Sequence, residues 1–256
     1  MTFEKEKIKL GVQPFTLRRY ARTLQGLEKC FAFCSKIGSS AVQLSAVYDA
    51  EPLLIKRFSE KYALDICVTH KSFESISQDC PALCSQHLVY DCKLIGLSRM
   101  PSIFNPSNRS EVLAFCEAMN KAQDIARTFG ISLAYHNHAF EFKHNIYDIL
   151  ISNLDQDIKF ILDLYWADYA GEDNFALMDK LGDRLAILHL KDSKTVLGRY
   201  KLMRTPGRGD FDFAKILSYA EANTACKYAL IELDFSLAPY RAIEYGMKHL
   251  KKVYES

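Results

Sequence analysis

The segment KFILDLYW, residues 159–166, contains three consecutive apolar residues, Phe160, Ile161 and Leu162. The side chains of a strand point alternately to its two faces, so an unbroken apolar run predicts a strand that is buried on both sides. Parallel sheets covered by helices are built from such strands, whereas a sheet with one wet face shows alternation. The segment therefore predicts an α/β fold with a parallel sheet.

Similar apolar runs recur along the whole chain and alternate with helical patterns, such as Leu24, Leu27, Phe31 and Cys34 at spacings of three and four. The predicted strands are 8–13, 40–45, 65–70, 94–99, 131–138, 159–166, 186–192 and 228–235. Eight strand-then-helix pairs are typical of the (β/α)₈ barrel, so we expect residues 1–256 to form a single TIM barrel. A doubly wound sheet is the alternative, but GVQPF after Lys9 lacks its GxGxxG turn.

The charges nearly cancel, with 33 basic and 31 acidic residues and a net charge of +2. Nothing in this balance indicates a nucleic acid or a membrane surface as partner. The stretch MTFEKEKIKL has no apolar segment of a secretory leader, and no stretch approaches the roughly 18 apolar residues of a membrane span. The eight cysteines show no zinc-ribbon spacing, which favours buried thiols in a reducing compartment. We therefore expect a cytoplasmic protein.

Polar residues follow the apolar run of each predicted strand. The active site of a TIM barrel lies at the C-terminal ends of its strands, so these residues are the site candidates. They are Gln13, Gln43, His70, Arg99, His136, His138, Asp163, His189, Lys191, Glu232 and Asp234. In contrast, His87, His144 and His249 fall on predicted helices or loops, where we expect them to be exposed.

Three consecutive predicted strands, the sixth to the eighth, bring Asp163, His189 and Glu232 to the same end of the barrel. The fifth strand adds a histidine or a glutamate. Carboxylates and imidazoles without thiolates suit Mn²⁺, Mg²⁺, Co²⁺ or Zn²⁺. Plain ion pairs are the alternative, Asp163 with an arginine and Glu232 with Lys191. The joint occurrence at three successive strand ends favours a metal.

Six motifs, taken in order, resemble the sugar phosphate isomerase/epimerase family, the xylose isomerase-like TIM barrels. These motifs are GVQPFTLR, DICVTH, YHNHAFEF, DLYW, LHLKD and PGRGD, and they span essentially the whole chain. The combination of YHNHxFEF with HLKD is the most specific part. The resemblance implies a metal-dependent sugar isomerase or epimerase.

Position by position, the resemblance implies one divalent metal ion, Mn²⁺ before Mg²⁺, Co²⁺ or Zn²⁺. The implied ligands are Glu141, Asp163, His189 and Glu232. The last three coincide with the strand-end candidates. Glu141 lies three residues beyond His138, past the predicted strand, so His136 or His138 stays an alternative for its place.

The segment HLKDSK also resembles HLNDSK of the endonuclease IV DNA-repair enzymes, which hold three zinc ions. Trp166 stands where those enzymes have a histidine after the strand-six aspartate. Lys201 and Met203 stand where they have an Asp-x-His pair. A trinuclear site therefore lacks its ligands, and we do not expect DNA repair.

A divalent ion can bind the carbonyl and adjacent hydroxyl oxygens of a ketose or polyol ketone and stabilise an enediolate. We expect Glu141 and Glu232 to act as bases from two sides, with His136 and His138 donating to a substrate oxygen or carrying a proton. The same histidines could expel a β-hydroxyl, so a dehydratase of the inosose dehydratase type is the alternative. A sugar-binding barrel without catalysis is a third reading.

The remaining candidates for substrate contacts are His70, Trp166, Lys191 and Arg208. Each has a structural alternative. His70 could belong to a capped loop, and Trp166 could pack in the core. Lys191 could form an ion pair with Asp234, and Arg208 could lie in a surface turn formed by PGRGD. The sequence shows no phosphate cradle. We therefore expect a small sugar or sugar-like substrate, and homo-oligomer formation is left open.

Overall fold

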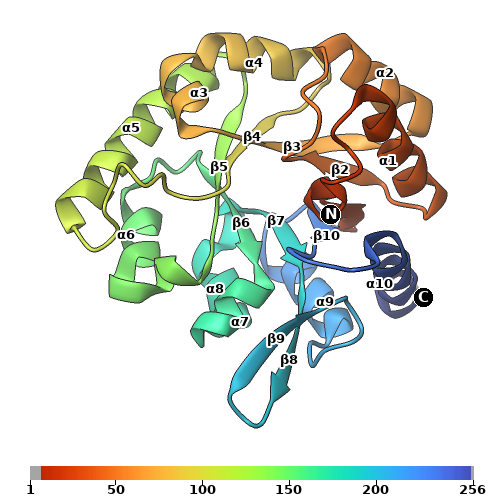
Figure 1. Ribbon diagram of the computed structural model, residues 1–256. Coiled ribbons are helices and arrows are strands. Elements are labelled where there is room, and N and C mark those ends of the chain that lie inside the picture. Colours follow the sequence, from red (N-terminus) through yellow and green to blue (C-terminus); the bar gives the residue numbers. More distant parts are fainter. Residues whose placement is uncertain (1–6, 255–256) are drawn as a thin grey trace, which may run out of the picture.

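The computed structural model describes residues 7–254, in which eight parallel strands close into a barrel (Figure 1). These strands are β1 (Lys9–Val12), β2 (Ala41–Leu44), β3 (Asp65–Lys71), β4 (Leu94–Leu97), β5 (Ser132–His136), β6 (Lys159–Asp163), β7 (Leu185–Leu190) and β10 (Tyr228–Ile231). β1 pairs with both β2 and β10, which closes the ring. The predicted (β/α)₈ barrel is therefore confirmed. Residues 1–6, which begin the stretch considered for a leader, lie outside the described residues.

The helices surround the barrel (Figure 1). They are α1 (Leu24–Lys36), α2 (Pro52–Tyr62), α3 (Phe73–Gln78), α4 (Cys80–Val89), α5 (Arg109–Thr128), α6 (Ile146–Asn153), α7 (Leu164–Ala170), α8 (Asn174–Leu181), α9 (Phe213–Asn223) and α10 (Pro239–Tyr254), with short 3₁₀ turns η1 (Pro14–Leu17), η2 (Ala139–Asn145) and η3 (Gly182–Arg184). In α1 the buried face includes Leu27, Phe31 and Cys34, as the spacing predicts. None of the helices within residues 7–254 combines the length and apolarity that a membrane crossing requires.

Two apolar clusters form the core. The larger one fills the layer between the helices and the barrel. The smaller one lies within the barrel and comprises Ala41, Cys67, Val68, Ala134, Ile161, Ile187 and Leu230. All eight cysteines are buried and unpaired, which confirms their predicted role as small apolar side chains.

β5 and β6 end earlier than predicted, because the chain turns away where the polar residues begin. β5 ends at His136 and β6 at Asp163, whereas we expected residues 138 and 166. The Oδ1 atom of Asp163 accepts a hydrogen bond from the Trp166 amide at 3.0 Å, so Asp163 caps the start of α7. DLYW thus begins a helix, so the last three residues of the predicted strand 159–166 are helical instead.

An antiparallel hairpin that the sequence did not predict follows β7. It consists of β8 (Asp192–Val196) and β9 (Tyr200–Arg204), and it projects from the barrel at the bottom of Figure 1. The hairpin contacts α7, since the Tyr165 hydroxyl donates to the carbonyl of Lys201 in β9 at 3.2 Å. The hairpin therefore stands beside the C-terminal ends of the strands, where the site candidates lie.

Candidate active site

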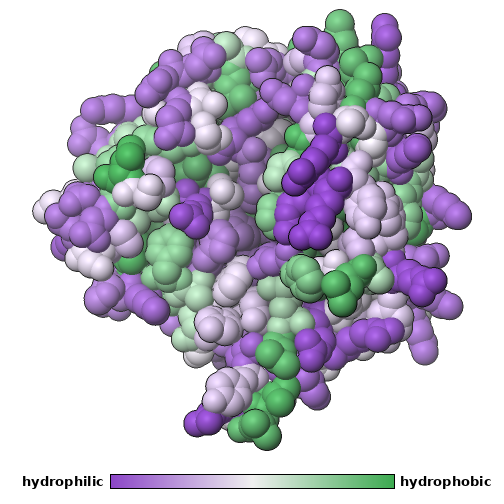
Figure 2. All heavy atoms as spheres, in the orientation of Figure 1, coloured by the Kyte–Doolittle hydropathy of each residue, from purple (hydrophilic) through white to green (hydrophobic). Residues whose placement is uncertain are grey.

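A cavity of about 620 Å³ opens at the C-terminal ends of the barrel strands. In Figure 2, hydrophilic side chains surround a depression near the centre of the view. This volume lies within the usual range of small-molecule sites. Nine of the predicted site residues line the cavity: Gln13, His70, Arg99, His136, His138, Trp166, Lys191, Glu232 and Asp234.

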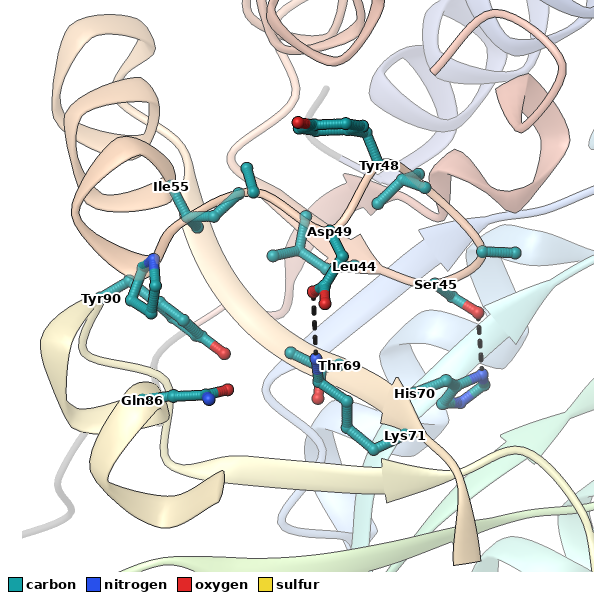
Figure 3. Close-up of a pocket in the computed structure, with 14 residues that line it drawn as sticks. Leu44, Ser45, Tyr48, Asp49, Ile55, Thr69, His70, Lys71, Gln86 and Tyr90 are labelled. Atoms are coloured by element: carbon teal, nitrogen blue, oxygen red, sulfur yellow. Dashed lines mark hydrogen bonds and ion pairs between the residues drawn. The ribbon is translucent and has the colours of Figure 1, made fainter. Parts of the chain in front are cut away.

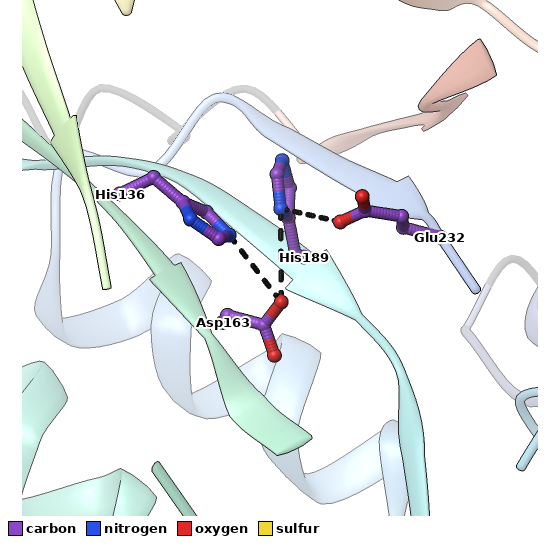
Figure 4. A group of neighbouring side chains, drawn as sticks. All are labelled: His136, Asp163, His189 and Glu232. Atoms are coloured by element: carbon purple, nitrogen blue, oxygen red, sulfur yellow. Dashed lines mark hydrogen bonds and ion pairs between the residues drawn. The ribbon is translucent and has the colours of Figure 1, made fainter. Parts of the chain in front are cut away.

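Four buried side chains from neighbouring strands converge at the floor of the cavity (Figure 4). They are His136 at the end of β5, Asp163 at the end of β6, His189 in β7 and Glu232 directly after β10. One ligand atom from each lies within 4.8 Å of all the others. Together they form a group that could hold a metal ion, and we refer to it as the four-residue cluster.

The hydrogen bonds of His136 fix which of its ring nitrogens carries the proton. Its Nδ1 lies 3.1 Å from the carbonyl oxygen of Ser98, which can only accept, so Nδ1 carries the hydrogen. Nε2 therefore carries a hydrogen only in the doubly protonated ring, and it faces Oδ2 of Asp163 at 3.3 Å. In the singly protonated ring Nε2 is an acceptor. Two acceptors face each other, and a cation between them would satisfy both.

His189 repeats this arrangement on the other side of the cluster. Its Nε2 lies 2.8 Å from Oε1 of Gln43, which leaves Nδ1 as the unprotonated nitrogen of the neutral ring. Nδ1 lies 2.9 Å from Oε2 of Glu232, and in the neutral ring both of these atoms are acceptors. Burial lowers the pKa of His189, so the neutral ring dominates. The donor set therefore fits a divalent ion bound by imidazoles and carboxylates.

Lys191 places a buried positive charge against the same carboxylates. Its Nζ lies 2.8 Å from Asp163 Oδ2, 3.1 Å from Glu232 Oε2 and 2.6 Å from Asp234 Oδ1. Burial would raise the pKa of Asp163, but the ammonium outweighs it and the pKa falls to about 2. Burial is likewise outweighed at Glu232, where the Lys191 ammonium holds the pKa well below its ordinary value. Three carboxylates against one ammonium give this site a net negative charge, which a bound cation would compensate.

Glu141, which the resemblance places among the metal ligands, lies apart from the four-residue cluster. It belongs to η2 and is fully buried. Its Oε1 accepts from the hydroxyl of Tyr135 at 2.7 Å and its Oε2 from the amide of His138 at 2.8 Å. Burial raises the pKa of Glu141 to about 7. His136 stands with the other three residues instead, which was the alternative that the sequence left open.

Three side chains present unpartnered polar atoms in the cavity wall. His138 Nδ1, His70 Nε2 and Trp166 Nε1 are buried and have no hydrogen-bond partner in residues 7–254. Burial lowers the pKa of His138 to about 3 and that of His70 well below its ordinary value, so both rings are neutral near pH 7. A polyhydroxylated ligand would supply the hydrogen bonds that these three atoms lack.

Arg208, a predicted substrate contact, lies outside the cavity. Its guanidinium sits 4.3 Å from the ring centroid of Tyr245 on α10. The PGRGD loop instead wraps around Asp192, whose carboxylate accepts the backbone N–H groups of Ser193, Gly207, Gly209 and Phe211. Sequence patterns contain no signal for this loop anchor, because Asp192 is the last residue of the predicted strand 186–192.

A smaller pocket of about 80 Å³ adjoins the cavity and shares Ser45, His70 and Lys71 with it (Figure 3). Figure 3 shows the Ser45 hydroxyl beside the His70 ring, with Oγ and Nδ1 3.3 Å apart. It also shows Asp49 facing Lys71, with 3.7 Å between Oδ1 and Nζ. A liquid water occupies about 30 Å³, so this pocket has room for a few waters and not for a sugar.

Comparisons with known proteins agree with this fold. An inosose dehydratase of Clostridium perfringens is 28% identical over 165 residues, which are 58% of this chain and 56% of that protein. The chain thus spans about half the length of this curated relative. A sugar phosphate isomerase/epimerase structure from Parabacteroides distasonis has a TM-score of 0.79 at 19% identity, covering 98% of this chain and 96% of the other.

A second solved structure, an IolI protein with a bound zinc atom, has a TM-score of 0.70 at 15% identity and covers 96% of both chains. At such identities the two structures establish the fold alone. The family model of the xylose isomerase-like TIM barrel matches residues 87–253 of the 256 residues. Because the match covers more than half of the chain, the protein belongs to the xylose isomerase-like TIM barrel family.

Proposed function

We propose that this protein is a divalent-metal-dependent enzyme that removes the proton next to the carbonyl group of a sugar or polyol ketone. The observation that carries the proposal is the four-residue cluster, in which one ring nitrogen of His136 and one of His189 face carboxylate oxygens at the floor of a sugar-sized cavity. His136, Asp163, His189 and Glu232 would hold the ion, with Mn²⁺ as the first candidate. When bound, it would acidify the C–H group between the substrate's carbonyl and hydroxyl oxygens.

The chain offers proton acceptors on two sides of the cavity. Glu232 follows β10 and His138 follows β5, and these strands are three positions apart in the closed ring of eight. The Lys191 ammonium keeps Glu232 ionised against its burial, so its carboxylate can accept a proton from carbon. Nδ1 of neutral His138 has no hydrogen-bond partner in residues 7–254, so this nitrogen can accept a proton or donate one. Isomerisation or epimerisation is the first reaction that this arrangement supports.

Elimination of water is the second candidate, and two observations favour it. Glu141 is hydrogen-bonded outside the cavity, so the pair of facing carboxylates expected for an epimerase is not assembled. The curated relatives from Clostridium perfringens and Clostridium tetani are named inosose dehydratases. In a dehydration, Glu232 would take the proton from carbon while a histidine protonates the departing β-hydroxyl. Both reactions begin with the same proton abstraction.

Exchange with heavy water tests the shared step and separates the two reactions. The Mn²⁺-loaded protein is incubated with a panel of ketoses and inososes in D₂O, and the products are analysed by mass spectrometry. Isomerisation or epimerisation adds deuterium to the recovered sugar, whereas dehydration gives a product lighter by one water. Glu232→Gln should abolish either change, and Glu244→Gln, on the exposed face of α10, should not. If a sugar binds but neither deuterium exchange nor elimination occurs, the protein is a sugar-binding barrel without catalysis.

We also place the protein in the cytoplasm. The eight buried, unpaired thiols support a reducing compartment.

A further inference from the structure

Arg18, in the GVQPFTLR motif, is held rigidly in the wall of the cavity. Its Nη1 donates to the carbonyl of Phe15 at 2.8 Å and its Nη2 to the carbonyl of Asp234 at 2.9 Å. The guanidinium also lies 4.0 Å from the ring centroid of Phe15. These contacts fix the orientation of the group without neutralising it, because no carboxylate within residues 7–254 lies at ion-pair distance from Arg18.

Two more basic side chains line the same cavity, Lys71 and Arg99. The side chain of Lys71 is 26% exposed, and its one carboxylate neighbour is Asp49, which is 3.7 Å away and 96% exposed. An ion pair with so exposed a partner contributes little. Arg99 is exposed, and across the described residues it forms no ion pair. The outer part of the cavity is therefore positively charged.

The inner part of the cavity has the opposite character. Asp163, Glu232 and Asp234 share a single buried ammonium there. A ligand that fits both parts carries carbonyl and hydroxyl oxygens at its inner end and a negative charge at its outer end. A neutral sugar would leave the fixed guanidinium of Arg18 without a counter-ion in a partly desolvated wall.

We propose that Arg18, supported by Lys71 and Arg99, binds an oxyanion of the substrate, so that the substrate is a sugar acid or a sugar phosphate. A guanidinium matches the planar, two-oxygen geometry of a carboxylate and also binds phosphate. This inference rests on the proposed function, because it names the substrate class of the same cavity. It also gives the GVQPFTLR motif a chemical role.

The single tryptophan gives a direct readout of binding. Trp166 is the only tryptophan in the chain and lines the cavity, so its fluorescence reports occupancy without turnover. Mn²⁺-loaded protein is titrated at constant ionic strength with D-glucuronate, D-glucose 6-phosphate and D-glucose. We expect at least one anion to bind more tightly than glucose. The tighter of the two anions shows whether the oxyanion is a carboxylate or a phosphate.

Arg18→Gln should weaken binding of that anion by about tenfold or more, since a charge-assisted hydrogen bond contributes roughly 1.5 to 3 kcal/mol. Its affinity for glucose should change less than about twofold. Arg19→Gln is the matched control: it removes the same charge from the next residue, which is exposed and does not line the cavity. This control should leave all three affinities unchanged, which excludes a general effect of net charge.

Arg18 also ties the chain at Phe15 to Asp234, so its removal could disturb the cavity itself. Arg99→Gln avoids this problem, because the Arg99 side chain is exposed, and it should weaken the anion alone by a smaller factor. The proposal is overturned if neither anion binds more tightly than glucose, or if both variants weaken all three ligands equally. Deuterium exchange with neutral ketoses would then still support the proposed function. If the anion binds selectively but no acidic ketose exchanges deuterium or loses water, the proposed function is overturned while this inference stands.

Discussion

The ammonium of Lys191 lies 2.8 Å from Oδ2 of Asp163, and both side chains are almost completely buried. Burying two charges is costly, and only close pairing offsets that cost. Glu232 and Asp234 contact the same ammonium, so a single lysine compensates several carboxylates. The folded chain therefore depends on positive charge at this point, and Lys191 and a bound divalent ion would each supply part of it.

Lys191→Met should destabilise the metal-free protein by about 3 to 5 kcal/mol, because it leaves buried carboxylates without their ammonium. Added Mn²⁺ should raise the melting temperature of this variant more than that of the wild type, since the ion replaces the lost charge. Chemical and thermal unfolding, each with EDTA or with Mn²⁺, measures both effects. Lys201→Met, which breaks the more exposed pair with Asp168, is the control and should cost about 1 kcal/mol or less. Equal stability of the two variants would contradict the role given to Lys191.

Asp163→Asn should lose the metal while keeping the fold. The amide oxygen of asparagine can still cap α7 through Trp166, as Oδ1 of Asp163 does, but the negative charge toward the cluster is gone. Plasma mass spectrometry after dialysis should find about one divalent ion per wild-type chain and less than about a tenth in the variant. Asp168→Asn, a carboxylate outside the four-residue cluster, should retain the metal. Close to three zinc ions per chain would instead revive the endonuclease IV reading.

The barrel and three members of the cluster follow from local patterns. Apolar runs mark the strands, and the polar residue that ends each run lies at the C-terminal end of the barrel. Asp163, His189 and Glu232 end three runs that are neighbours in the sheet, and register places Asp163 directly beside His189. Sequence periodicity is sufficient here, because all three residues lie within one residue of the end of a strand.

Features that depend on turns or distant partners were not predictable. The hairpin turn has Leu197 and Gly198 at positive φ, 51° and 68°, where an Asn-Gly pair would be the usual signal. Glu141 lies within the η2 turn, beyond the end of β5, so strand periodicity does not reach it. His87 was expected to be exposed, but it is fully buried, with Nε2 2.8 Å from the hydroxyl of Thr69 on a separate strand. That expectation was wrong because the partner is distant in sequence.

His87 should make the protein less stable in mild acid. Burial lowers the pKa of His87 from 6.5 to about 4, so between these values the unfolded chain binds a proton that the folded chain does not. The contribution of neutral His87 to the free energy of unfolding is therefore fully present above pH 6.5, and it is lost as the pH drops toward 4. Between pH 7 and pH 4.5, His87→Gln should lose about 2 kcal/mol less unfolding free energy than the wild type. Urea unfolding at the two pH values measures this difference, and exposed His144→Gln should behave as the wild type does.

Gly209→Ala should detach the PGRGD loop from Asp192. A Cβ atom at Gly209 would lie 2.1 Å from Oδ1 of Asp192 and 2.4 Å from the carbonyl oxygen of Ser193, so the loop must move and its hydrogen bonds to Asp192 must lengthen. We expect a loss of about 2 to 4 kcal/mol in urea unfolding. Gly198→Ala, at the hairpin tip, has a positive φ but open space around its Cβ, so it should cost only about 1 to 2 kcal/mol from backbone strain. Faster amide hydrogen exchange at Gly207 and Phe211 should accompany Gly209→Ala alone. If both alanine variants lost the same stability and neither changed the exchange rates, the hydrogen bonds to Asp192 would not be what holds the loop.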